Sequence, residues 1–236
     1  MNIKKLIVDS YSIPLPVPVK AYAAGLMTGF DIVVVRIIDE NENEGQGYTT
    51  GHTGFGSSIV RIIKDSYESI LIGADSSRIE YLWLQMWKKT HYVGRGGQAS
   101  FAISAVDAAL WDLLGKRLKQ PLWKLLGGYA PKVKVYAGNI DLNFPIEQIL
   151  DNATKNIKEG YKAIKMRLGR DTLKEDLSRV EAMRNHIGDE IELMADANEA
   201  WRVDQALKAS NELANFNLTW LEEPITPDDF RGYAYL

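Results

Sequence analysis

Five polar residues in the second half of the chain could act together as a chemical site: Lys165, Arg167, Asp196, Asn198 and Glu222. Each stands at, or just after, the end of a short apolar run of the kind that forms a buried strand. Where such strands are parallel neighbours, their ends meet at one edge of a sheet, roughly 4.8 Å apart. The spacing therefore predicts that two cations, two carboxylates and one amide gather at the same edge.

The two carboxylates point to a metal ion. Neighbouring carboxylates of Asp196 and Glu222 would repel each other strongly unless a cation lay between them. Oxygen ligands of this type suit Mg²⁺, which often binds one or two carboxylates and keeps its other positions for water and substrate. Asn198, two residues after Asp196, could hydrogen-bond a metal ligand or a substrate hydroxyl. The alternative is that each acid only starts a turn at its strand end.

The cations stand in the sequence Lys165-Met166-Arg167. Side chains alternate along a strand, so Lys165 and Arg167 share one face and would point to the site. The apolar residues that share the other face, and would pack against helices, are Ile164, Met166 and Leu168. Two cations side by side repel each other unless an anion or nearby carboxylates compensate them. The alternative is a strand end surrounded by solvent.

These residues must be positioned by a repeating pattern of strands and helices, which begins near residue 132. Strands expected over 133–138, 163–167, 191–196 and 218–222 alternate with helices expected over 145–159, 171–187 and 202–215. This alternation is typical of βα units with a parallel sheet. A dinucleotide-binding sheet is the rival, but no G-x-G-x-x-G motif follows the first strand.

A (β/α)₈ barrel fits the repeat better, although such a barrel typically needs about 250 residues. Residues 132–236 provide only 105, enough for four of the eight units. We therefore expect 132–236 to be the first half of a modified TIM barrel, and the chain to be a fragment of a longer protein.

The first part of the chain, 1–125, has a different order of expected strands and helices. Strands are expected over 3–13, 30–38 and 46–50, and helices over 57–72, 78–89 and 99–117, with a short helix from Pro121 that Gly127 and Gly128 end. This pattern predicts a three-stranded meander followed by helices, an α+β domain joined to an α/β domain. Asp107 and Asp112 on the last long helix are interpreted as structural hydrogen-bond acceptors.

Composition excludes several classes of protein. Lys and Arg total 28 against 31 Asp and Glu, a net charge of −3, so no basic surface for nucleic acid is expected. The chain has no cysteine and three histidines, which excludes disulfides and thiolate metal sites. No stretch approaches the roughly 20 apolar residues of a membrane helix, and the apolar run near the N-terminus is too interrupted for the h-region of a secretory leader. We expect a soluble cytoplasmic protein.

Several motifs together resemble one family. They are the glycine-rich run at 94–98, the sequences AISAVDAALWDLLGK and PLWKLLGG that follow, the K-x-R strand at 165–167, LMADAN at 193–198 and WLEEP at 220–224. In combination they are similar to the mandelate racemase and muconate-lactonizing branch of the enolase superfamily. The resemblance covers nearly the whole chain.

The resemblance implies an α+β capping domain over 1–125 and a modified barrel. It implies that Asp196 and Glu222 are the first two Mg²⁺ ligands, and that a third acidic ligand follows residue 236. Lys165 and Arg167 match the family's K-x-K pair, whose second lysine is usually an acid/base. A homo-oligomer is expected at full length.

The same resemblance implies that capping-domain loops near 20–30 and 48–55 contribute to substrate recognition. Thr49, Thr50 and His52 would suit a hydroxylated substrate, although an ordinary polar turn is equally consistent with them.

Family chemistry abstracts the proton next to a substrate carboxylate, with Mg²⁺ stabilising the enediolate that forms. A lysine beside another cation has a lowered pKa and could act as the base. Arg167 departs from the family pattern, because a guanidinium keeps its proton and is a poor base. This favours dehydration of a sugar acid over two-sided racemisation. A racemase, epimerase or cycloisomerase, or a catalytically silent fragment, are the alternatives.

Overall fold

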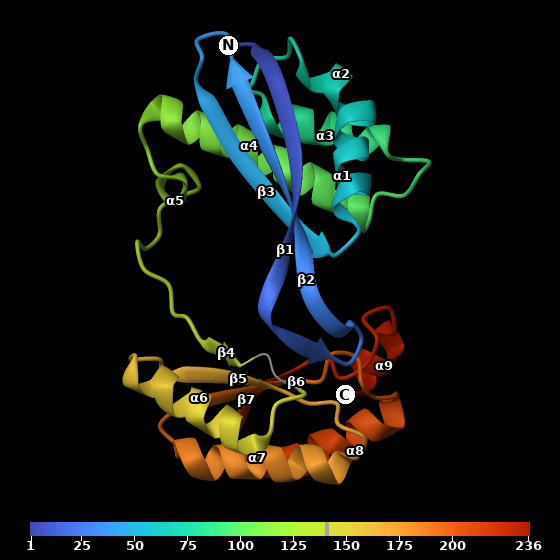
Figure 1. Cartoon of the computed structure of the whole chain (residues 1–236), viewed down its shortest axis with the longest axis vertical. Coiled ribbons are helices and arrows are strands. Elements are labelled where there is room, and N and C mark those ends of the chain that lie inside the picture. Colours follow the sequence, from blue (N-terminus) through green and yellow to red (C-terminus); the bar gives the residue numbers. More distant parts are fainter. Residues whose placement is uncertain (140–141) are drawn as a thin grey trace. The chain divides into compact units, whose positions relative to one another are not determined.

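The computed structural model describes residues 1–139 and 142–236, which form two compact units (Figure 1). The first unit contains Met1–Pro16 and Gly29–Lys132, and the second contains Val17–Thr28 and Val133–Leu236. Within these described ranges, no helix combines the length and apolar character needed to cross a membrane.

The first three strands form one sheet in the order β1 (Ile3–Ala21), β2 (Gly25–Asp39) and β3 (Glu44–His52). Strands β2 and β3 are antiparallel, with Phe30 opposite His52 and Ile38 opposite Glu44. The three-stranded sheet expected from the sequence is confirmed.

The expected first strand, 3–13, is too short, because β1 continues through three prolines to Ala21. Pro14, Pro16 and Pro18 are spaced by two residues, so their backbone nitrogens face the same side of the strand. The carbonyl oxygen of Ile13 lies close to Gly29 of β2, and the strand order β1-β2-β3 puts β1 at an edge of the sheet. Prolines on that edge remove no ladder hydrogen bond, so a strand can contain them.

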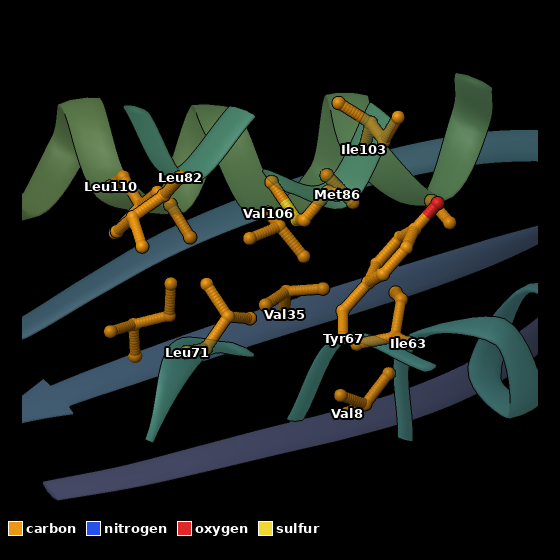
Figure 2. Close-up of a cluster of buried hydrophobic side chains, with 14 of the residues drawn as sticks. Val8, Val35, Ile63, Tyr67, Leu71, Leu82, Met86, Ile103, Val106 and Leu110 are labelled. Atoms are coloured by element: carbon orange, nitrogen blue, oxygen red, sulfur yellow. The ribbon is translucent and has the colours of Figure 1, made fainter. Parts of the chain in front are cut away.

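Helices cover one face of this sheet. The helices of the first unit are α1 (Gly56–Ile62), the π-helical turn η1 (Ile63–Tyr67), α2 (Glu68–Leu71), α3 (Ile79–Lys89), α4 (Gln98–Leu118) and α5 (Leu122–Leu125). Of these, α1 and α4 pack against β3, whereas α5 contacts α4 and buries no residue. Helix α4 lies so close to β3 that a Cβ atom on Gly47 would be 2.2 Å from the carbonyl oxygen of Ala105. Figure 2 shows part of the resulting core, in which Val35 of β2, Tyr67 of η1 and Leu110 of α4 are fully buried.

The interpretation of Asp112 as a structural acceptor is confirmed. Its carboxylate accepts a hydrogen bond from the backbone N–H of Gln46 at 2.7 Å and contacts Lys116 at 2.7 Å. Asp107 differs, because burial and the nearby charge of Glu80 raise the pKa of its carboxyl group.

The second unit contains a parallel sheet in the order β4 (Ala137–Asn139), β5 (Ala163–Arg167), β6 (Glu192–Asp196) and β7 (Leu218–Glu222). The helices between and after these strands are α6 (Ile146–Lys158), α7 (Leu173–Ile187), α8 (Val203–Leu213) with the 3₁₀ turn η2 (Ala214–Phe216), and α9 (Phe230–Tyr235). The predicted alternation of parallel strands and helices is confirmed.

The strand expected over 133–138 is wrong in its extent, because β4 begins only at Ala137. Ala137 pairs with Ile164, the second residue of β5, so residues before Ala137 have almost no strand beside them. The apolar residue Val133 suggested a buried strand, but it is 85% exposed.

One buried arginine connects the segments that lead into β6 and β7. Arg184 of α7 donates hydrogen bonds to four carbonyl oxygens, at 2.8 to 3.0 Å: those of Gly188, Ile191, Phe216 and Asn217. These residues lead into β6 and β7, so a single guanidinium fixes where both strands begin.

We expect Arg184→Met to lower the free energy of unfolding by about 3 kcal/mol or more, since it leaves several buried carbonyls without a donor. Urea unfolding followed by circular dichroism measures the loss. Arg202→Met is the control: Arg202 is exposed and paired with Asp204, so its replacement should leave the midpoint almost unchanged. Equal losses in the two variants would contradict the role given to Arg184.

Candidate functional site

The ends of β5, β6 and β7 bring three predicted site residues into direct contact. The ammonium Nζ of Lys165 lies 3.1 Å from Oδ2 of Asp196 and 3.0 Å from both Oε1 and Oε2 of Glu222. The strand register explains this, because Asp196 and Glu222 are direct partners across β6 and β7. The side chain of Asp196 is only 3% exposed and that of Lys165 16%, whereas that of Glu222 is 35% exposed. The two carboxylates thus converge on one cation, as expected, but that cation is the lysine ammonium.

The pKa of Lys165 differs from the expectation of a lowered value. Burial lowers it, but the hydrogen bonds and charges of Glu222 and Asp196 outweigh burial, so the pKa is raised above its ordinary value. The expectation was wrong because it considered only the neighbouring cation, Arg167, and not the two carboxylates that the fold places against the ammonium. While these contacts last, Lys165 holds its proton.

Arg167 is on the same strand but has a different environment. Its Nε and Nη1 atoms are buried, and no acceptor for them exists among the described parts of the chain. The expected division of faces is confirmed: Ile164, Met166 and Leu168 are fully buried in the core of the second unit. A buried donor without an acceptor costs about 1–3 kcal/mol, and an anion bound to this guanidinium would recover that cost.

Asn198 lies beside the carboxylate pair. Its backbone N–H donates to Oδ1 of Asp196 at 3.0 Å, and its side-chain Nδ2 donates to Oε2 of Glu223 at 3.3 Å. Its side-chain oxygen, Oδ1, is buried and has no hydrogen-bond partner within the described ranges. Both Asn198 and Glu223 have left-handed backbone conformations, with φ of 46° and 43°.

Two aromatic residues at the site were not predicted. The indole Nε1 of Trp220 donates to Oε2 of Glu222 at 3.1 Å, and the Trp220 ring meets the ring of Tyr136 edge-on at 5.6 Å. The Lys165 ammonium lies 5.8 Å from the centre of the Tyr136 ring, within cation–π range. Alternation along β7 puts Trp220 on the face of Glu222 and could have revealed it. Tyr136 precedes β4 and gave no such signal.

A buried acid accepts hydrogen bonds from the backbone of the loop that follows β5. Both carboxylate oxygens of Asp176 in α7 accept hydrogen bonds from the backbone N–H groups of Gly169 and Arg170, at 3.1 to 3.3 Å. Thr172 and Glu175 form a capping box at the start of the same helix. This anchoring fixes the path of the chain just beyond Arg167.

A cavity of about 930 Å³ adjoins the loops that follow β5 and β6. The charged residues in its lining are Lys20, Arg170, Arg202, Lys208, Asp171 and Glu199. Of these, only Lys20 belongs to a segment that the resemblance linked to substrate recognition, the loop near 20–30. The five predicted site residues do not line this cavity, so it is distinct from the carboxylate pair.

Of the polar residues expected in the capping loop, Thr50 and His52 are exposed at the end of β3. Thr49 is buried, with 7% of its surface exposed. The alternation along β3 turns it toward the interior of the first unit, which for Thr49 favours the alternative of an ordinary polar turn.

The donor set fits a divalent cation such as Mg²⁺. Asp196 and Glu222 present three carboxylate oxygens to one ammonium, and hard oxygen ligands are those that Mg²⁺ prefers. Across residues 1–139 and 142–236, no group of three His, Cys, Asp or Glu side chains is arranged to hold a metal ion. The described residues therefore offer two protein ligands.

Two family models match the chain. Residues 5–127 match the mandelate racemase / muconate lactonizing enzyme N-terminal domain, and residues 148–236 match the enolase C-terminal domain-like family.

The chain is also similar to curated proteins and solved structures. It is 47% identical over 232 residues to the 3,6-anhydro-α-L-galactonate cycloisomerase of Streptomyces coelicolor, covering 98% of this chain and 64% of the relative. It is 34% identical over 212 residues to the L-talarate/galactarate dehydratase of Salmonella typhimurium, covering 89% and 53%. A crystal structure of a racemase from Streptomyces coelicolor A3(2) with bound magnesium superimposes with a TM-score of 0.96 at 46% identity, covering 98% and 65%. The chain thus spans about two thirds or less of the length of these relatives.

We expect Lys165→Met to lower the free energy of unfolding by about 2 kcal/mol at pH 7, because two carboxylates lose the cation between them. The value is below that for a fully buried pair, since Glu222 is partly exposed. Chemical unfolding of the two proteins measures the difference.

The pH dependence has a definite sign. Because the folded-state pKa of Lys165 is raised, its contribution is complete below the unfolded value of about 10.4 and is lost as the pH rises through the higher folded value. The difference between wild type and Lys165→Met should therefore stay constant from neutral pH to about pH 9 and shrink above about pH 10.4. A difference that is absent at pH 7 would contradict the compensation of the carboxylates by Lys165.

Proposed function

This chain belongs to the mandelate racemase / muconate lactonizing enzyme family, and from that we propose that it forms part of a Mg²⁺-dependent enzyme that removes the proton next to the carboxylate of a sugar acid. The observation that carries the proposal is the convergence of Asp196 and Glu222 on one cation at the ends of neighbouring strands. Bound Mg²⁺ would neutralise negative charge that develops on the substrate carboxylate.

The four βα units are proposed to be the first half of a modified barrel, because the matched relatives are longer and barrel enzymes build their sites at the carboxyl ends of the strands. Asp196 and Glu222 would then be two of the metal's protein ligands. The third acidic ligand is proposed to lie outside the 236 residues.

Lys165 and Arg167 have separate roles in this proposal. Two buried donors of Arg167 have no acceptor within the described part of the chain, and the planar guanidinium suits a substrate carboxylate and the charge that forms on it. Lys165 must leave the two carboxylates when a metal takes its place, and its ammonium is then free to contact the anionic substrate. The main base is proposed to come from outside this chain, because a guanidinium is a poor base.

Dehydration of a hydroxylated acid is the first candidate reaction. After the proton leaves the carbon next to the carboxylate, the hydroxyl of the adjacent carbon departs with a proton as water. Arg167 supports this choice, because a base on only one side of the carbon is enough for elimination. The galactarate dehydratase similarity is in keeping with it.

Cycloisomerisation is the second candidate, favoured by the 47% identity to a cycloisomerase of a galactonate derivative. The two reactions differ in mass balance, since dehydration gives a product lighter by one water and cycloisomerisation an isomer. Mass spectrometry of products from galactarate and from an anhydro-galactonate distinguishes them. Turnover of neither acid by the full-length protein would overturn the substrate class.

We expect Asp196→Asn and Glu222→Gln each to abolish Mg²⁺ binding by isothermal calorimetry. Wild-type chain should bind Mg²⁺ weakly, because the described residues supply only two protein ligands and the ion must displace Lys165. Glu192→Gln is a matched control, since Glu192 stands at the other end of β6 and pairs with Lys134. Tight Mg²⁺ binding that survives the loss of either carboxylate would contradict the assignment.

We expect Arg167→Met to reduce turnover about 10²-fold or more in the full-length enzyme, the scale of losing one preorganised electrostatic donor. Arg167→Lys keeps the charge but introduces a group that can deprotonate. It should therefore allow deuterium exchange of the substrate α-proton from the second face, measured by NMR in deuterated water. Exchange from both faces by the wild type would remove the argument for elimination.

A further inference from the structure

The nitrogen and the oxygen of the Asn198 side-chain amide differ in their hydrogen bonding. Its nitrogen Nδ2 donates to Oε2 of Glu223 at 3.3 Å, whereas its oxygen Oδ1 is buried and has no partner among the residues described. A carboxylate can only accept hydrogen bonds, so the nitrogen must be the atom that faces Glu223. Glu223 therefore determines that the oxygen is the free end of the amide.

The backbone holds this pair in place at the proposed metal site. The N–H of Asn198 is bound to the carboxylate of Asp196, and the N–H of Glu199 donates to the carbonyl of Glu223 at 2.7 Å. The loops after β6 and β7 are thus connected directly beside the two proposed ligands.

Glu223 occupies a strained position. Its φ of 43° is in the left-handed region, which Asn tolerates but which is unfavourable for Glu by roughly 1–2 kcal/mol. Glycine would fit this backbone better. The need for a left-handed turn therefore does not account for a glutamate here, while the hydrogen bond to Asn198 does.

We propose that Glu223 is a positioning residue that fixes the Asn198 amide so that its Oδ1 accepts a hydrogen bond from a hydroxyl group of the ligand. An acceptor that is shielded from water and has no protein partner costs about 1–3 kcal/mol, and a donor brought by the ligand recovers this. The chemistry selects a hydroxylated acid over one with a bare hydrocarbon chain. The ligand class rests on the proposed function, whereas the role of Glu223 toward Asn198 does not.

The side-chain amide signal of Asn198 in ¹⁵N-labelled protein reports the positioning without any ligand. Asn198→Gly assigns the signal by its disappearance and suits the left-handed backbone. In Glu223→Ala, which keeps the Cβ atom and so the same backbone constraint, we expect the Nδ2 proton shifts to change and their separation to collapse. Glu223→Gln, which keeps an acceptor oxygen without the charge, should show a smaller change. Glu199→Ala, a neighbouring acid with φ of 64°, should leave the signal in place.

Binding of two acids in the presence of Mg²⁺ tests the selection of hydroxyl groups. Galactarate and adipate have the same six-carbon dicarboxylate chain, and only galactarate has hydroxyls. Glu223→Ala should weaken galactarate binding about fivefold, the scale of one hydrogen bond, and leave adipate binding unchanged. In the Asn198→Gly background the same change should have no further effect.

An Asn198 signal that is unchanged in both Glu223 variants, or equally changed in Glu199→Ala, overturns the positioning role. A fivefold loss that persists in the Asn198→Gly background overturns it as well, since Glu223 would then act without Asn198. If wild type binds neither acid, the proposed substrate class fails, and the amide signal still decides the role of Glu223.

Discussion

The site depends on charge compensation between two neighbouring strand ends. Parallel pairing of β6 and β7 places Asp196 directly beside Glu222, and two carboxylates at that spacing require a cation. Lys165 of β5 provides it, at about 3 Å from both. The same three oxygens suit Mg²⁺, so the ammonium and the metal would compete for one position. The apolar face of β5 and the helices beneath it serve to keep that lysine aimed at the pair.

This competition gives Lys165 two states that differ in function. While it is bound to the carboxylates, its pKa is raised and it remains an ammonium. In the proposed function, a divalent ion held by Asp196 and Glu222 would free the lysine ammonium to contact an anionic substrate. Nε and Nη1 of Arg167 have no acceptor among residues 1–139 and 142–236, which is why an incoming anionic substrate is the partner proposed for this guanidinium.

The sequence was sufficient to predict the elements and the gathering of the site residues, because both follow from periodicity. A period of two along β5 separates Lys165 and Arg167 from their apolar neighbours, and the βα repeat makes the strands parallel. Features that depend on a partner strand could not be predicted. The prolines of β1 are tolerated because β1 is an edge strand, and residues 133–136 are not a strand because the described residues include no strand paired with them. The position of the Lys165 ammonium between the two carboxylates, which raises the pKa of this lysine, depends on how its long side chain is oriented. Residue spacing in the sequence does not determine that orientation.

The central claim is that Asp196 and Glu222 form one cation position that a divalent ion can take from Lys165. Paramagnetic Mn²⁺, which accepts the same oxygen ligands, tests it directly through the broadening of backbone amide signals in ¹⁵N-labelled protein. The account predicts that the first signals to broaden are those of Ala197, Asn198 and Glu223, that excess Mg²⁺ restores them, and that Lys165→Met broadens them at lower Mn²⁺. Broadening that begins elsewhere, such as around Glu80 and Asp107, or that is unaffected by Lys165→Met, would contradict it.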